Sequence, residues 1–256
     1  MYSQKKSTPA FLFYTLFLAV LILSCKKKHT FFKSLPSSST NITFENNLEK
    51  KKLFNILYYL YYYNGAGVAT GDINNDGLQD IYFAANSKGN NKLYLNKGNF
   101  EFEDITDKAK VAGTADWCTG VSMADVNSDG YLDIYVSTVS SKYGLKGHNE
   151  LFINNKNNTF TEQSAEYGLN TSCFTTQSAF FDFDRDGDLD CYILNQSHHP
   201  HANIVDTINR KNYDSLSGDR LYRNDGPSGL DDNGRRTGGF TEASKEAGIY
   251  QSNLGY

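Results

Sequence analysis

An acidic ten-residue motif occurs three times in this chain, and it constrains the fold more than any other feature. The copies read GDINNDGLQD, ADVNSDGYLD and FDFDRDGDLD, and their first aspartates are Asp72, Asp125 and Asp182. The flanking residues repeat as well, because IYFAAN, IYVSTV or CYILNQ follows each copy and NKLYLN, NELFIN or DRLYRN comes later. Self-similarity at a period of roughly 50 residues indicates an array of supersecondary units, each of which buries its apolar face against its neighbours.

Each unit contains four short apolar or aromatic runs that are separated by Gly, Asn or Asp turns. In the first unit these predicted strands are Val68–Gly71, Asp80–Ala85, Lys92–Asn96 and Phe100–Asp104. Four short strands per unit are typical of one blade of a β-propeller. The sequence therefore predicts an all-β fold, a β-propeller of four-stranded blades.

About three blades are present in the sequence, and this number is smaller than that of a closed propeller. Propellers close with about four to eight blades. Either the sequence is part of a longer propeller, which we favour, or the propeller closes by association of chains. The predicted blades span residues 65–112, 113–170 and 171–250, and a fourth starts at 251–256.

The stretch YNGAGVATGDINNDGLQDIYF, residues 63–83, resembles FG-GAP repeats, also called VCBS repeats, which form the blades of integrin alpha-subunit propellers. The wider arrangement is similar to that of the bacterial relatives of cartilage acidic protein, and the resemblance extends over residues 53–256. By analogy with adhesion proteins of this kind, it implies a binding module whose ligand is a protein or a glycan. Such a fold-level analogy says little about the identity of the ligand.

The acidic motif has the chemistry of a calcium loop. Ca²⁺ takes about six to eight oxygen ligands, and alternate side chains of a tight loop can supply them before a glycine turn. The loops are not EF-hands, because the position of the bidentate Glu is taken by Phe83, Val136 and Ile193. The predicted ligands are Asp72, Asn74, Asp76, the carbonyl of Leu78 and Asp80; Asp125, Asn127, Asp129, the carbonyl of Tyr131 and Asp133; and Asp182, Asp184, Asp186, the carbonyl of Asp188 and Asp190.

The alternative is an Asp-rich hairpin turn that binds no metal. Three copies with convergent carboxylates favour Ca²⁺ at about three sites, because like charges in one loop repel each other without a cation. We expect these ions to be structural, since no open ligand position adjoins a catalytic acid, base or nucleophile. The third loop has the most carboxylates and is expected to bind most tightly, although Arg185 could offset this.

The N-terminus has the pattern of a secreted lipoprotein. Lys5 and Lys6 precede the apolar stretch AFLFYTLFLAVLIL, and Ser24-Cys25 follows it. This junction resembles the lipobox of bacterial lipoproteins, which implies a signal peptide at 1–24, lipid attachment to Cys25, a tether at 25–52 and the propeller at 53–256. The expected location is the cell envelope, anchored to the outer membrane and facing the periplasm or the outside. An ordinary secretory signal and an uncleaved anchor are the alternatives.

The other cysteines do not form a complete disulfide framework, because three remain if Cys25 carries lipid. Cys191 stands where the other repeats have isoleucine, so it is expected to be a buried thiol. A bridge between Cys118 and Cys173 stays open. The aromatic segment FNILYYLYYYNG, residues 54–65, is expected to pack under the first blade rather than to form a ligand platform.

The longest insertions fall between the second and third strands of each unit, on the face opposite the acidic loops, where repeat proteins often bind partners. One insertion carries His198, His199 and His201. Three interpretations of these histidines stay open: they contact a ligand, they bind a transition metal, or they lie in a solvated loop. A net charge of −4 gives no electrostatic case for nucleic acid. We expect a non-catalytic binding protein whose only membrane contact is the lipid. The alternatives are an enzyme acting on extracellular polysaccharide and a structural subunit of an outer-membrane complex.

Overall fold

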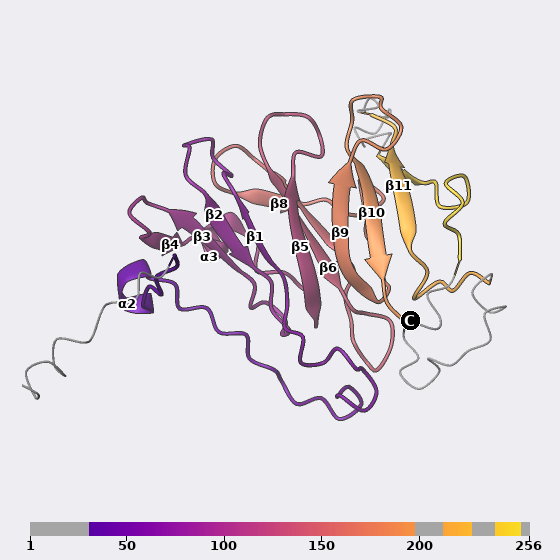
Figure 1. Ribbon diagram of the computed structural model, residues 1–256, viewed down its shortest axis with the longest axis horizontal. Coiled ribbons are helices and arrows are strands. Elements are labelled where there is room, and N and C mark those ends of the chain that lie inside the picture. Colours follow the sequence, from indigo (N-terminus) through magenta and orange to yellow (C-terminus); the bar gives the residue numbers. More distant parts are fainter. Residues whose placement is uncertain (1–30, 198–211, 227–238, 252–256) are drawn as a thin grey trace, which may run out of the picture. The chain divides into compact units, whose positions relative to one another are not determined.

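The computed structural model describes residues 31–197, 212–226 and 239–251 (Figure 1). The chain divides into two units, Met1–Pro36 and Ser37–Tyr256, and the second contains all of the described sheet structure. Twelve strands of this part form three four-stranded antiparallel sheets, one for each sequence repeat. The prediction of an all-β fold is therefore confirmed.

In every sheet the four strands lie side by side in their order along the chain. Two one-turn helices accompany them, α2 (Ser37–Thr40) and α3 (Thr106–Ala109). The strands are β1 (Val68–Gly71), β2 (Asp80–Phe83), β3 (Lys92–Asn96) and β4 (Phe102–Asp104); β5 (Cys118–Ala124), β6 (Asp133–Thr138), β7 (Glu150–Asn154) and β8 (Phe160–Glu162); and β9 (Thr175–Phe181), β10 (Asp190–Asn195), β11 (Arg220–Asn224) and β12 (Phe240–Glu242).

The bounds of β1 and β3 match the prediction, whereas β2 and β4 are shorter than predicted. β2 ends at Phe83, although the backbone N–H of Ala84 still donates to the carbonyl of Gly67 at 2.9 Å. The next N–H, that of Ala85, donates to the side-chain oxygen of Asn91 at 2.8 Å. β4 starts only at Phe102, since Asn99 and Phe100 have φ angles of 54° and 62° and form the turn before it. Left-handed residues of this kind do not continue a strand.

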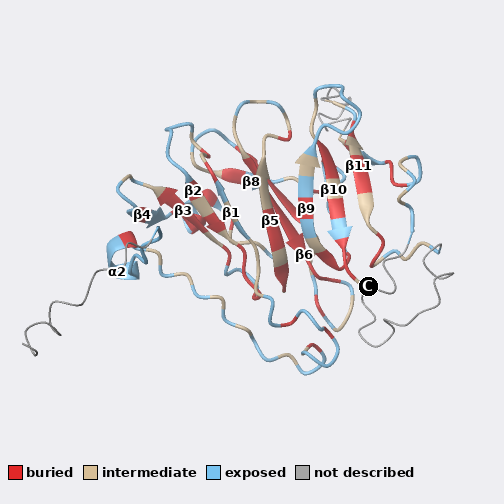
Figure 2. Ribbon diagram, in the orientation of Figure 1, coloured by how far each residue is buried: buried red, intermediate tan, exposed pale blue. Residues whose placement is uncertain are grey.

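Successive sheets pack face to face. Tyr82 and Leu93 of the first sheet share a buried cluster with Ile134 and Phe152 of the second. A second buried cluster joins the other face of the second sheet, for example Tyr135, to the third sheet. The strands are mainly buried and the connecting loops mainly exposed (Figure 2).

The first strands of the three sheets are neighbours, because β5 contacts both β1 and β9. Glycine makes this approach possible. A Cβ atom on Gly67 would lie 2.6 Å from the backbone nitrogen of Val121, and one on Gly120 would lie 2.6 Å from the backbone oxygen of Thr176. The equivalent residue of the third repeat is Gln177, whose side-chain amide donates to the carbonyl of Val121 at 3.3 Å.

The expected place of the aromatic segment at residues 54–65 was wrong. Phe54, Tyr59 and Tyr62 are buried with Trp117 and Phe174, which directly precede β5 and β9, and not under the first sheet. The physical reason is the large indole surface of Trp117. Its ring centroid lies 4.8 Å from that of Phe54 and 5.0 Å from that of Tyr62.

Part of the predicted tether also packs on the first sheet. Phe44 stacks on Phe83 with ring centroids 4.8 Å apart, and the backbone N–H of Thr43 donates to the hydroxyl of Tyr94 at 3.2 Å. The side-chain amide of Asn46 donates to the side-chain oxygen of Asn86 at 2.6 Å. These residues therefore pack on the face of the first sheet that is turned away from the second sheet.

Cys118, Cys173 and Cys191 are all buried free thiols, so the bridge that stayed open for the first two is not formed. The prediction of a buried thiol at Cys191 is confirmed. Across the described ranges, no helix is long and apolar enough to span a membrane. Cys25 and the predicted signal peptide lie outside the described residues.

Candidate metal-binding loops

Each copy of the acidic motif forms the loop between the first and second strands of its sheet, as predicted. The loops are residues 72–79 between β1 and β2, 125–132 between β5 and β6, and 182–189 between β9 and β10. The same two positions of every loop are left-handed. Asn75, Ser128 and Arg185 have φ angles of 59°, 55° and 66°, and Gly77, Gly130 and Gly187 have φ angles of 86°, 87° and 100°.

The first aspartate of each motif folds the loop around its own carboxylate. The backbone N–H of the loop glycine donates to Oδ2 of this aspartate, and an earlier N–H of the loop donates to Oδ1. The glycine bonds measure 2.7 Å at Asp72, 2.8 Å at Asp125 and 3.3 Å at Asp182. These hydrogen bonds hold the loop closed around the carboxylate.

The last aspartate of each motif is buried and joins three parts of its repeat. Asp80, Asp133 and Asp190 are at most 1% exposed. Oδ2 accepts the N–H of the residue after the first aspartate, at 2.6 to 3.1 Å, and Oδ1 accepts the N–H of the last residue of the third strand, at 2.8 Å. This carboxylate therefore fixes the loop to the second and third strands.

An asparagine at the end of the third strand connects the acidic loop of its own repeat to that of the preceding repeat. Sequence reasoning did not identify this residue. The side-chain amide of Asn154 donates to the carbonyl of Leu132 in its own loop and to the carbonyl of Ile73 in the loop before, at 3.1 and 2.8 Å. Asn224 repeats this with the carbonyls of Leu189 and Val126. The signal was available, since asparagine ends the third strand of all three repeats.

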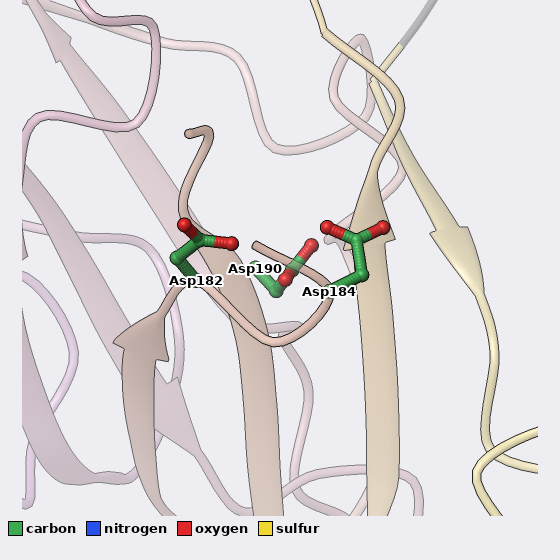
Figure 3. A group of neighbouring side chains, drawn as sticks. All are labelled: Asp182, Asp184 and Asp190. Atoms are coloured by element: carbon green, nitrogen blue, oxygen red, sulfur yellow. The ribbon is translucent and has the colours of Figure 1, made fainter. Parts of the chain in front are cut away.

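The three loops do not gather their carboxylates equally. In the third loop, one oxygen each of Asp182, Asp184 and Asp190 lies within 4.8 Å of the others. Among the described residues, no other set of three acidic, histidine or cysteine side chains brings its ligand atoms this close together. Figure 3 shows the carboxylates of Asp182 and Asp184 on either side of Asp190. The donor set consists of oxygen atoms only, which fits a hard cation such as Ca²⁺.

A family model described as "FG-GAP-like repeat" matches residues 72–136 and 139–193. Residues in these two ranges therefore have the sequence of FG-GAP-like repeats. Their matched ranges contain all three acidic loops, so the sequence resemblance is confirmed for this part of the chain. The third sheet extends beyond the matched range through β11 and β12.

Curated relatives with a similar sequence are the cartilage acidic protein 1 of Xenopus tropicalis and that of Homo sapiens. The first is 31% identical over 183 residues and the second 29% identical over 180 residues, in both cases 70% of this chain. The chain spans 26% of the length of each of these relatives. The similarity to cartilage acidic protein is therefore homology over a part of that protein.

A solved structure of an Agrocybe aegerita lectin, described as recognising non-reducing terminal N-acetylglucosamine, is also similar. It is 17% identical, with a TM-score of 0.33, and the match covers 68% of this chain and 37% of the lectin chain. Likeness at this level does not bear on the fold or the ligand of the FG-GAP-like repeats.

Burial shifts the titration of Asp80 and Asp133, the last aspartates of the first two motifs. It raises the pKa of Asp133 to about 7, and the charges of Asp129 and Asp125 add to the rise, while the N–H groups of Asn154 and Val126 oppose it. Burial raises the pKa of Asp80 as well, against the same kind of backbone hydrogen bonds. A cation in the loop would favour the charged carboxylates and oppose this rise.

The remaining predicted ligands lie in the same loops with different surroundings. Oδ2 of Asp76 accepts a hydrogen bond from the side chain of Asn74 at 3.0 Å, and Oδ2 of Asp129 lies 3.4 Å from Nζ of Lys156. The second loop thus already has a cationic neighbour from the protein. The structure places Asn127, Asp186 and the carbonyl-bearing residues Leu78, Tyr131 and Asp188 in the loops, whereas His198, His199 and His201 lie outside the described residues.

Proposed function

We propose that the chain is part of a calcium-stabilised, non-catalytic β-propeller that binds a protein or glycan on the bacterial cell envelope. One observation carries the proposal: the three sequence repeats close the same hairpin with the same acidic loop and the same backbone hydrogen bonds. Only a common requirement of the loops explains why the carboxylates recur at this place in each sheet.

The arrangement of the sheets supports the propeller part of the proposal. Each sheet has four antiparallel strands in chain order, and the first strands β1, β5 and β9 are neighbours. Face-to-face packing of successive sheets around their first strands is how the blades of a propeller are arranged. In this proposal each four-stranded sheet is one blade.

The chemistry of the loops supports calcium as the ion. Asp182, Asp184 and Asp190 offer gathered carboxylate oxygens, to which Asp186 and the carbonyl of Asp188 can be added. Mg²⁺ is less suitable, because it keeps several of its waters and is rarely held by protein ligands alone. The ion would be structural, since the last aspartate of the loop already connects two strands through backbone hydrogen bonds.

A non-catalytic role is supported by homology to a protein with FG-GAP-like repeats and by the use of the acidic side chains. Both oxygens of each buried aspartate accept hydrogen bonds from backbone N–H groups, as Asp133 does from Val126 and Asn154. We place the ligand on the opposite ends of the strands, where the loops between the second and third strands differ most in length.

The function is tested by screening the purified full chain against a glycan array and a panel of purified extracellular proteins, with calcium and with a chelator. We expect saturable binding to at least one ligand, lost on chelation and restored by added calcium. Binding that is unaffected by the chelator would contradict the calcium requirement. Cleavage of a polysaccharide by the chain would contradict the non-catalytic role.

Envelope display has its own test, at the cysteine predicted to carry lipid. In cells that express the full chain, Cys25→Ala is expected to move the protein from the membrane fraction to the soluble fraction, because acylation provides the proposed anchor. The matched control is Cys173→Ala, which removes a buried thiol and should leave the fractionation unchanged. An unchanged membrane association of Cys25→Ala would contradict lipid anchoring at this residue.

A further inference from the structure

The third and fourth strands of the first and third sheets are joined by an ion pair at equivalent positions. Nζ of Lys92, the first residue of β3, lies 2.9 Å from Oδ2 of Asp104, the last residue of β4. Nη1 of Arg220, the first residue of β11, lies 3.8 Å from Oε2 of Glu242, the last residue of β12. Each of these sheets therefore pairs a cation on its third strand with an acid on its fourth.

The second sheet has an acid at both positions. Glu150 is the first residue of β7 and Glu162 is the last residue of β8. The cation that the other two repeats supply from their own chain is thus replaced by a carboxylate. Two carboxylates that share a site without a cation repel each other, and such a pair is costly unless something neutralises it.

Glu150 is a buried carboxylate of which only one oxygen accepts hydrogen bonds. It is 1% exposed, and its Oε1 accepts hydrogen bonds from the backbone N–H and the hydroxyl of Thr114, at 2.7 and 2.6 Å. Its Oε2 has no hydrogen-bond partner within the part of the chain that the structure describes. Burial raises the pKa of Glu150 and the charge of Glu162 adds to the rise, whereas the hydrogen bonds from Thr114 and the charge of His148 oppose it. An unpaired buried polar atom needs a physical explanation, and an absent ligand is one.

Glu150 and Glu162 line a cavity of about 390 Å³, which is also lined by Asp107, Lys110 and His148. No ion pair among the described residues joins Lys110 to either glutamate. Glu150 begins a strand and Glu162 ends the next one, so the cavity lies at the opposite end of the sheet from the acidic loop 125–132. This is the end at which the longest connections of the repeats are found.

The geometry points to a binding site for an organic cation, a ligand that presents a primary ammonium or a guanidinium group to Glu150 and Glu162. These are the groups that Lys92 and Arg220 supply at the same place in the neighbouring repeats. A metal ion fits less well, because the described residues bring three ligand atoms within 4.8 Å of one another only at Asp182, Asp184 and Asp190. An ammonium or guanidinium group has several N–H donors and can bridge carboxylates that are farther apart. The inference does not rest on calcium binding by the acidic loops.

The test is calorimetric titration of the purified full chain with n-butylguanidine and with n-butylamine, and with uncharged n-butanol as the control ligand. We expect saturable binding of the two cations and none of the alcohol. Glu150→Gln should weaken cation binding about tenfold or more, because hydrogen bonds between charged groups are the strong ones. Gln keeps an oxygen acceptor for Thr114, so the variant should fold, and Glu162→Gln gives a second variant with the same expectation.

Two further variants sharpen the result. Glu150→Arg introduces the residue that the third repeat has and should abolish binding, because the tethered cation occupies the site. Glu166→Gln removes an exposed acid from the loop after β8 and should leave binding unchanged. Absence of saturable binding of both cations at millimolar concentrations, or equal binding by Glu150→Gln and the unaltered chain, would overturn the inference.

Two more ligands separate the sources of such a cation. A blocked Gly-Arg-Gly peptide represents an arginine side chain of a protein, and agmatine represents a free small amine. Tighter binding of the peptide supports a protein partner, and tighter binding of agmatine supports a small-molecule ligand. Equal loss of both in Glu150→Gln confirms that they use the same site.

Discussion

Removing calcium should lower the thermal unfolding midpoint of the chain by about 5 to 10 °C for each loop that loses its ion. A site saturated at a hundredfold excess over its Kd stabilises the folded state by about 2.7 kcal/mol. For a protein of about 150 to 250 residues, each kcal/mol shifts the midpoint by roughly 2 to 4 °C. The effect arises because the carboxylates of an empty loop repel each other beside a buried aspartate, for example Asp133, that still fixes two strands.

The measurement is differential scanning calorimetry of the full chain with calcium, with magnesium and with a chelator. Magnesium should restore less of the midpoint than calcium does. An identical midpoint in calcium and in chelator would show that the loops need no ion.

The order of the loops can be tested with two variants at the same motif position. Asp184→Ala removes a carboxylate from the group that is already gathered in the third loop, whereas Asn74→Ala removes a neutral amide from the first. Asp184→Ala should therefore reduce calcium affinity more in isothermal titration calorimetry. A loss no larger than that of Asn74→Ala would contradict the expected order, and the charge of Arg185 would be the first explanation to examine.

Trp117→Ala is expected to reduce the free energy of unfolding by about 3 to 5 kcal/mol, the range for truncation of a large buried aromatic side chain. Trp117 is 1% exposed, and its ring contacts the rings of Phe54, Tyr59 and Tyr62. The cavity left by the indole cannot be filled by one side chain, since its contacts come from a segment far away in the sequence. The variant should also loosen residues 54–63, because Phe54, Tyr59 and Tyr62 all contact the indole ring.

Urea denaturation followed by circular dichroism measures the first effect, and limited proteolysis under native conditions measures the second. The control is Phe100→Ala, which truncates an aromatic ring that is 67% exposed in a turn of the first repeat. Its effect should stay within about 0.5 kcal/mol, as is usual for surface substitutions. Similar losses in the two variants, or an unchanged cleavage rate near residues 54–63 in Trp117→Ala, would contradict the proposed packing.

The sequence predicted the repeats and most strands because short-range chemistry determines them. Asp72, Gly77 and Asp80 specify one hairpin through side-chain to backbone bonds and one left-handed glycine, and the motif occurs three times. Strand ends were less predictable, since Ala84 and Ala85 are apolar residues that fit a strand. The N–H of Ala85 instead donates to the side chain of Asn91, six residues further along the chain.

Long-range contacts were not predictable from the same patterns. Nothing in the aromatic segment indicates that Phe54 and Tyr62 contact Trp117, because any buried surface would satisfy aromatic rings. The paired acids of the second repeat were visible in the aligned repeats, but the meaning of Glu150 depended on its burial and on its unpaired oxygen. The chemistry of the acidic loops could therefore be predicted from the sequence, whereas the contacts between the sheets could not.

The asparagine bonds between successive loops give the array a direction. The loop at 72–79 is completed by Asn154 of the next repeat, and the loop at 125–132 by Asn224 of the one after it. A repeat that is cut out at its acidic motif would therefore lose a bond that its own sequence does not encode. Anyone who shortens, exchanges or recombines such repeats should place the junction after the third strand, so that every loop except the last keeps the amide of its successor.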